Sequence, residues 1–376
     1  MLCAGGGVVN PETQLVFDLV SAKSLSGQER PAAEVVVRHG DALGFETSID
    51  QVGNAIAHRG APADEAVIHI VLLGHIDTVP GDIPVRIEDG VLHGRGSVDA
   101  KGPLAAMLVG AARADIPDGV RLTVAGAVGE EASGSIGARH LVDIWRPDAC
   151  IIGEPSDWDG VTLGYKGRLL ASVSATCDNS HSAGKELSAN DELFAWWALV
   201  LERIELFNTS SDRAFDQIQA TIGAMCSSCD GFTQQATINT GFRLPIAMGP
   251  QEFSGIIESL ATDRIAIKFD GAERASATDR NDPVVRALSV AIRKDGGRPH
   301  PKLKTGTADL NVVAPIWQCP IAAYGPGDSA LDHTPIEHLH LDEYQRSIRV
   351  ITTAIESLAE ELLARVDRSV DQISMV

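Results

Sequence analysis

The sequence lacks any apolar run of the about 20 residues that a membrane-spanning helix needs. Its first residues, Met1-Leu-Cys-Ala-Gly-Gly-Gly-Val-Val, have no basic region and too short an apolar stretch for a signal peptide. The six cysteines are irregularly spaced, which argues against a disulfide framework. These absences together lead us to expect a cytoplasmic protein.

Positive charge is also scarce. The chain has 31 lysines and arginines against 51 aspartates and glutamates, a net charge of −20. Such a balance disfavours nucleic acid or an anionic membrane as a partner and favours cationic or zwitterionic small substrates. The hydrophobic content of 44% is ordinary for a globular protein, and 376 residues exceed the size at which one core usually keeps growing. We therefore expect two domains.

Up to Gly164, buried strands alternate with helices. Continuous apolar runs of strand length are typical of strands that are covered on both faces. The expected strands cover residues 67–73, 122–128 and 149–152, and the expected helices cover residues 31–43, 103–114 and 135–144. This alternation predicts an α/β fold, with a mostly parallel-centred sheet flanked by helices.

The pattern changes after Gly164. The expected order becomes strand, helix, strand, strand, helix, strand, over residues 168–177, 192–207, 218–225, 236–242, 252–260 and 265–269. That βαββαβ order predicts a small α+β sandwich. Helix–strand alternation resumes near Asp282 and closes with a helix over residues 341–364. We expect one domain of residues 1–164 and 275–376, with residues 165–274 inserted into it.

Five separated segments each offer a histidine or a carboxylate where a predicted strand ends or a turn begins. They are Gly74–Thr78, Gly96–Gly102, Gly129–Glu131, Gly153–Pro155 and Asp332–Pro335. Open α/β sheets build their sites at the carboxyl ends of strands, so these side chains are expected to converge. Two histidines and four carboxylates could hold two divalent ions and leave one carboxylate for proton transfer.

The residue types suggest how such a site would work. His75 can ligate through one ring nitrogen, while Asp77 accepts from the other and fixes the tautomer. Asp99 has an oxygen for each of two ions. Glu130 and Glu131 are adjacent, so an extended backbone would point them to opposite sides, one to metal and one to water. Taken singly, each pattern has a common structural explanation, such as a helix N-cap or a solvated turn.

These motifs resemble the dinuclear-zinc family of acetylornithine deacetylase, succinyl-diaminopimelate desuccinylase and carboxypeptidase G, over nearly the whole chain. The resemblance implies a zinc-exopeptidase-like catalytic domain and two divalent ions, Zn²⁺ in the first place and Co²⁺ as the alternative. It implies that His75 and Glu154 bind one ion, that Glu131 and His333 bind the other, that Asp99 bridges them, that Glu130 is the general base and that Asp77 orients His75. It further implies a cis peptide bond after Asp99.

The same resemblance assigns roles outside the metal motifs. It implies that the inserted domain makes a homodimer and that His181 reaches into the partner's site to stabilise the oxyanion. Arg243 matches a strand arginine that binds the substrate carboxylate, and Thr307 lies in a loop that lines the substrate pocket. One departure is that Ser228-Cys229-Asp230 stands where the family often has an asparagine.

Within the family, the segments Gly164–Leu169 and Gly325–Ser329 look most like the branch that releases lysine or ornithine from an amino-group carrier protein. This implies an N-acyl or carrier-linked basic amino acid as substrate, lysine before ornithine, with Lys166 near it. Acetylornithine deacetylase, succinyl-diaminopimelate desuccinylase and a carboxypeptidase or dipeptidase of the same family are the alternatives.

Two other classes of function compete with the metal hydrolase. A serine acyl-enzyme would use the S-x-x-K of residues 182–185 and the K-T-G of residues 304–306, with Ser182 as nucleophile. Its S-x-N piece at residues 188–190 is too close to the S-x-x-K, which disfavours it. A metal-free binding scaffold would have lost a ligand or Glu130, and none is lost. The lone Cys226-x-x-Cys229 has no second pair to make a zinc knuckle.

Overall fold

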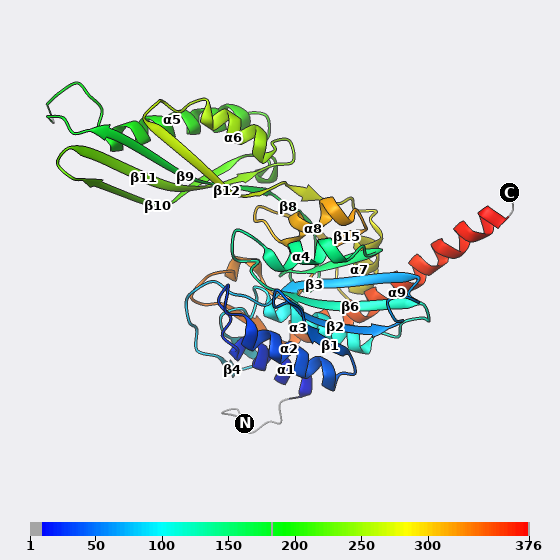
Figure 1. Ribbon diagram of the computed structural model, residues 1–376. Coiled ribbons are helices and arrows are strands. Elements are labelled where there is room, and N and C mark those ends of the chain that lie inside the picture. Colours follow the sequence, from blue (N-terminus) through cyan, green and yellow to red (C-terminus); the bar gives the residue numbers. More distant parts are fainter. Residues whose placement is uncertain (1–9, 182, 375–376) are drawn as a thin grey trace. The chain divides into compact units, whose positions relative to one another are not determined.

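The computed structural model describes residues 10–181 and 183–374, and the chain divides into two compact units (Figure 1). The larger unit comprises Met1–Gly164, Thr278–Lys302 and Val312–Val376, and the smaller comprises Tyr165–Ala277 and Leu303–Asn311. From the sequence, residues 303–311 are predicted to belong to the domain of residues 1–164 and 275–376, whereas in the structure they cluster with residues 165–277. The chain therefore passes between the units more often than a single insertion requires.

A mixed sheet forms the centre of the larger unit, in the order β1-β2-β6-β3-β7-β15-β8. Its strands are β1 (Glu46–Ile49), β2 (Ala55–Gly60), β3 (Ile68–His75), β6 (Val120–Ala127), β7 (Ala149–Gly153), β8 (Gly160–Tyr165) and β15 (Ile321–Ala323). Strand β3 pairs in parallel with β6 and β7, and β15 pairs in parallel with β7. The outer pairs β1–β2, β2–β6 and β8–β15 are antiparallel. The predicted sheet with a mostly parallel centre is confirmed.

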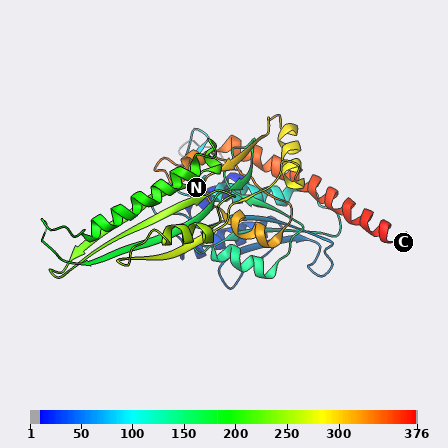
Figure 2. The same cartoon turned by 90° about the horizontal axis from the view of Figure 1, so that it is seen from above.

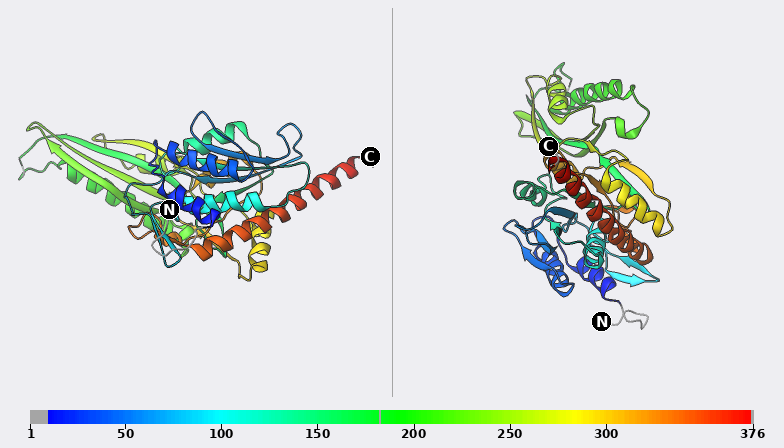
Figure 3. Two further views of the ribbon diagram at one scale, coloured as in Figure 1. Left: turned by 90° about the horizontal axis from the view of Figure 1, so that it is seen from below. Right: turned by 90° about the vertical axis from the view of Figure 1, so that its right-hand side faces the viewer.

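Helices cover both faces of this sheet (Figure 3). They are α1 (Pro11–Ser21), α2 (Arg30–Ala42), α3 (Lys101–Arg113), α4 (Ile136–Ile144), α7 (Pro283–Lys294) and α9 (Leu341–Ser374), while α8 (Asp309–Trp317) begins in the smaller unit and ends in the larger. On one face, a side chain at Gly126 would come within 3.1 Å of Leu104 in α3, so only glycine permits the close approach of that helix. On the other face, the rings of His69 and Trp145, which follows α4, meet edge to face. Because both faces are covered, most residues of β3 and β6 are apolar.

The larger unit also has a small sheet in the order β16-β5-β4, made of β4 (Arg86–Glu88), β5 (Val91–His93) and β16 (His338–His340). A short 3₁₀ turn lies at Ser329–Leu331 in the larger unit, and another lies at Ala214–Asp216 in the smaller unit. Strand β14 (His300–Lys304) begins in the larger unit and ends in the smaller. Among the described helices, none combines the length and hydropathy that a bilayer crossing requires.

The smaller unit has the predicted βαββαβ order, which is confirmed. Its elements are β9 (Gly167–Asp178), α5 (Ala189–Asn208), β10 (Gln219–Cys229), β11 (Thr233–Leu244), α6 (Pro250–Glu258), β12 (Ile265–Glu273) and the short β13 (Ser276–Ala277). The antiparallel sheet has the order β10-β11-β9-β12, and α5 and α6 lie on one of its faces (Figure 1 and Figure 2). Trp196, Phe242 and Phe253 are fully buried in the core between them.

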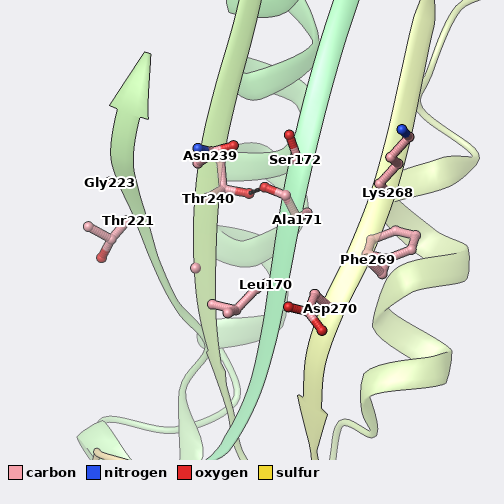
Figure 4. Close-up of a pocket in the computed structure, with 11 residues that line it drawn as sticks. Leu170, Ala171, Ser172, Thr221, Gly223, Asn239, Thr240, Lys268, Phe269 and Asp270 are labelled. Carbon is pink, nitrogen blue, oxygen red and sulfur yellow. Dashed lines mark hydrogen bonds between the residues drawn. The ribbon is translucent and has the colours of Figure 1, made fainter. Parts of the chain in front are cut away.

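The same sheet carries a shallow hollow of about 540 Å³, which Figure 4 shows in close-up. Residues from all four of its strands line it, among them Leu170, Thr221, Asn239 and Lys268. None of the eleven residues that line this hollow is one of the site residues predicted from the sequence.

Candidate metal centre

Three parallel strands bring three predicted ligands and the predicted base to one edge of the larger unit's sheet. In the β3–β6 ladder His75 is opposite Ala127, and in the β3–β7 ladder Gly74 is opposite Gly153. Glu130 and Glu131 follow β6 after a bend, and Glu154 follows β7 directly. Strand register alone therefore places these four side chains near one another.

Asp99 lies between the two histidines. Its Oδ1 is 3.1 Å from Nε2 of His75, and its Oδ2 is 3.1 Å from Nε2 of His333. The Asp99–Ala100 peptide bond is cis, as predicted. One carboxylate thus presents one oxygen to each histidine, the arrangement that a bridging ligand requires.

The potential ligand atoms form two groups that share Asp99. His75, Asp99 and Glu154 make the first, and Asp99, Glu131 and His333 make the second, with all ligand atoms of a group within 4.8 Å of one another. Nε2 of His75 is 4.0 Å from Oε1 of Glu154, and Nε2 of His333 is 3.0 Å from Oε1 of Glu131. Imidazole nitrogens and carboxylate oxygens are donors that Zn²⁺ and similar divalent ions accept, so the residues present fit a pair of such ions.

Glu130 lies beside these groups. His75, Glu130 and Glu131 also bring one potential ligand atom each within 4.8 Å of the others. The two glutamates lie in a bend and not on the extended backbone considered for them from the sequence. The bend brings the carboxylate of Glu130 close to both groups.

Asp77 is fully buried behind the centre and is held by several donors. Its Oδ1 is 3.4 Å from Nδ1 of His75, and it accepts hydrogen bonds from the backbone N–H of Glu130 (3.1 Å) and of Glu131 (3.0 Å). The hydroxyl of Ser26 donates to it at 2.7 Å. Asp77 therefore lies beside Nδ1 of His75 and also holds the backbone of the bend that carries both glutamates. Sequence reasoning missed Ser26 because nothing in a serine 51 residues earlier points to this carboxylate.

The charges of the centre alter one another's protonation. Burial by itself would lower the pKa of His75, but hydrogen bonds to Asp77 and Asp99 raise it well above its ordinary value. Hydrogen bonds to Asp99 and Glu131 raise the pKa of His333 to about 10. Burial would raise the pKa of Asp99, yet the two histidines hold it below its ordinary value. The raised pKa values favour protonated, positively charged forms of His75 and His333. Their positive charge lies where the positive charge of a bound metal ion would lie.

The predicted substrate residues come together within the smaller unit. Nη1 of Arg243 donates to Oγ1 of Thr307 at 2.7 Å, and that hydroxyl donates to the carbonyl of Lys166 at 3.0 Å. The ammonium of Lys166 donates to the carbonyls of Ala214 and Gln217, and burial together with the charge of Arg243 lowers its pKa to about 8. These bonds hold the ammonium of Lys166 within the fold, and its contact with the substrate stays a prediction.

His181 lies in the exposed loop between β9 and α5, where its Nδ1 accepts a hydrogen bond from the N–H of Ala183 at 3.1 Å. Ser182, the nucleophile of the rival serine mechanism, lies outside the described residues. The metal groups need neither residue, because all their members belong to the larger unit.

A family model and several known proteins match this chain over most of its length. A family model described as Peptidase family M20/M25/M40 matches residues 71–357. The [LysW]-lysine hydrolase of Deinococcus radiodurans is 45% identical over 92% of this chain and 96% of its own. A putative [LysW]-lysine/[LysW]-ornithine hydrolase of Thermococcus kodakarensis is 38% identical over 93% of this chain and 94% of its own.

Solved structures share the fold at lower identity. The M20 family metallo-carboxypeptidase Sso-CP2 from Sulfolobus solfataricus aligns with a TM-score of 0.75 at 15% identity, over 93% of this chain and 100% of that one. A tripeptidase from Staphylococcus aureus aligns with a TM-score of 0.73 at 19% identity, over 94% of this chain and 100% of that one. At such identities the likeness shows the fold alone.

Proposed function

The chain belongs to the peptidase family M20/M25/M40. We propose that it hydrolyses the amide bond between a basic amino acid and an amino-group carrier protein, releasing lysine. The observation that carries the proposal is the carboxylate of Asp99, which faces His75 on one side and His333 on the other. Ornithine is the second product we propose, since relatives at 38% identity and below carry both amino acids in their names.

Two divalent ions would be held by the two groups that share Asp99, with Zn²⁺ the first choice and Co²⁺ the alternative. Ions bound there would make water more acidic and would polarise the carbonyl of the scissile amide. Asp99 belongs to both groups and so joins them. Asp77 fixes the ring of His75 through its Nδ1.

Glu130 is the proposed general base. Its carboxylate takes a proton from the attacking water, whose oxygen bonds to the amide carbon. As the carbon–nitrogen bond breaks, the same carboxylate returns the proton to the departing amine. Support comes from the place of Glu130 beside His75 and Glu131 and from the bond that fixes its backbone to Asp77.

Arg243 and Thr307 are the proposed partners of the substrate's α-carboxylate, because a guanidinium fork and a hydroxyl can both donate to it. We further propose that residues 165–274 form the dimerisation domain and residues 1–164 with 275–376 the catalytic domain. His181 of each protomer then stabilises the oxyanion in the partner's site. The reaction belongs in the cytoplasm, where amino acids are made.

Competition assays with the metal-loaded protein test the proposal. The carrier conjugate of lysine, that of ornithine, acetyl-lysine, acetylornithine and succinyl-diaminopimelate would be compared by kcat/KM. We expect the lysine conjugate to give the highest value and 1,10-phenanthroline to abolish turnover. A higher kcat/KM for acetylornithine or succinyl-diaminopimelate would instead assign the chain to one of those deacylases, and turnover that survives the chelator would contradict a metal mechanism.

A further inference from the structure

Glu337 lies four residues after His333 and is fully buried. Its Oε1 accepts hydrogen bonds from the backbone N–H of Val98 at 2.9 Å and of Asp99 at 3.2 Å. One carboxylate therefore ties the segment that carries His333 to the turn that carries Asp99. Neither the metal groups nor the general base includes this residue.

The other oxygen of Glu337 is held by Arg95, whose Nη1 donates to it at 2.7 Å. The side chain of Arg95 is only 13% exposed, and its Nε donates to the carbonyl of Gly81 at 3.1 Å. A buried carboxylate and a mostly buried guanidinium need each other, since either one alone would be a buried uncompensated charge. Because Arg95 and Asp99 belong to the same turn, Glu337 forms hydrogen bonds with that turn at two places.

The turn of residues 94–101 has an unusual backbone, and the hydrogen bonds within it do not fix its position relative to the segment of His333. Gly94 and Gly96 adopt φ angles of +156° and +84°, which residues with side chains rarely take. The N–H of Ser97 bonds to the carbonyl of Gly94 at 3.1 Å, and the N–H of Lys101 bonds to that of Gly96 at 3.0 Å. These bonds close the turn upon itself, whereas the bonds to Glu337 fix it relative to the segment of His333.

We propose that Glu337, supported by Arg95, is a positioning residue that directs the carboxylate of Asp99 between His75 and His333. Holding the N–H of Asp99 fixes the direction in which its side chain leaves the backbone. A metal site binds more tightly when its ligands are oriented in advance by hydrogen-bonded neighbours. The inference rests on the proposed function, because it takes Asp99 as the ligand shared by two ions.

A purely structural role for Glu337 is the alternative, and Glu343 offers a matched control. Oε1 of Glu343 likewise accepts two backbone hydrogen bonds, from Trp158 and from Gly327, both at 2.9 Å. Those two residues carry no proposed metal ligand. Replacing either glutamate by glutamine removes a comparable carboxylate, but only Glu337 bonds to the turn of Asp99.

The experiment compares the metal-loaded wild type, Glu337→Gln and Glu343→Gln after dialysis against graded concentrations of a chelator. Metal retained per chain is measured by elemental analysis, and the Tm of each metal-free protein is measured beside it. We expect Glu337→Gln to release its metal at a chelator concentration about 10- to 100-fold lower than the wild type does. Losses of metal affinity of this size are usual when such a hydrogen-bonded neighbour is removed. Glu343→Gln is expected to retain metal like the wild type, whatever its Tm.

A second variant keeps the inference testable if Glu337→Gln does not fold. Arg95→Lys keeps the positive charge but cannot bond to Glu337 and to Gly81 with the same fork, so metal retention should fall in the same direction. The inference is overturned if the folded Glu337→Gln, or Arg95→Lys in its place, retains metal like the wild type. It is also overturned if Glu343→Gln loses metal to the same extent. A wild type that binds no pair of ions would contradict the proposed function itself.

Discussion

At the scale of single residues, Asp77 and Asp99 connect most of the candidate centre. Asp99 faces one histidine with each oxygen, while Asp77 accepts bonds from the backbone of Glu130 and Glu131 and lies beside Nδ1 of His75. Both side chains are shielded from water, which strengthens each of these interactions. The chemistry therefore depends on a few carboxylates whose directions are fixed before any substrate arrives.

Replacing Glu130 by glutamine tests the proposed proton transfer. The amide has nearly the same shape but cannot take a proton from water, so kcat is expected to fall by about 10³-fold. Metal content should stay near that of the wild type, since Glu130 is not a proposed ligand. Turnover would be followed by release of lysine and metal by elemental analysis. Ordinary turnover by this variant would remove Glu130 from the base role.

The sequence predicts the residues of the centre better than it predicts their supports. His75 ends a buried strand and Glu131 and Glu154 follow two others, so strand-end placement is enough to expect them in one place, and the structure brings them together. Ser26 and Glu337 were not singled out. A lone serine or glutamate in a turn has no pattern of its own, and its partner becomes visible only when distant segments pack.

At the scale of elements, the register of three parallel strands positions the centre. The apolar runs predicted as strands are confirmed as β3, β6 and β7, because strands covered on both faces have an unmistakable composition. The edge hairpin of β1 and β2 and the small sheet of β4, β5 and β16 were not predicted. Strands of three to six residues with mixed exposure give too few positions for a periodic signal.

The sheet also contains a half-buried pair of histidines that makes stability depend on pH. His58 and His69 both bond to the hydroxyl of Thr123, at 2.7 and 2.9 Å. Burial, together with the charge of Arg121, lowers the pKa of each from 6.5 to about 4. Between pH 6.5 and about pH 4, these histidines are protonated in the unfolded chain but stay neutral in the folded chain. The free energy of unfolding therefore falls as the pH drops below 6.5.

We expect the metal-free protein to lose about 2 kcal/mol of stability between pH 7 and pH 5 through this pair, after allowance for its partial exposure. The double variant His58→Gln/His69→Gln, which cannot be protonated there, should lose correspondingly less. Urea unfolding at the two pH values in the presence of a chelator measures the difference. Equal losses in the wild type and the variant would show that these histidines do not couple folding to pH.

At the scale of the whole molecule, the predicted roles divide between the two units. All proposed metal ligands belong to the larger unit, while Arg243, Thr307, Lys166 and His181 belong to the smaller one. The βαββαβ order of the smaller unit followed from the sequence, but its share of residues 303–311 did not. A nine-residue segment that joins another unit by packing leaves no mark in composition or spacing.

The proposed dimer predicts complementation between two inactive variants. Glu130→Gln lacks the proposed base, and His181→Ala lacks the side chain that is proposed to act in the partner's site. Mixing them under conditions that exchange subunits should restore about a quarter of wild-type activity, since half the dimers are mixed and each has one complete site. Each variant alone serves as the control. No recovery in a mixture shown to contain mixed dimers would rule out a shared His181.

The most direct test of the account is a crystal structure of the protein grown with Zn²⁺, in which anomalous scattering locates the metal. We predict two peaks about 3.5–4 Å apart. Asp99 should contact both ions, His75 and Glu154 one, and Glu131 and His333 the other. A single peak, or two peaks that share no carboxylate of Asp99, would contradict the central claim.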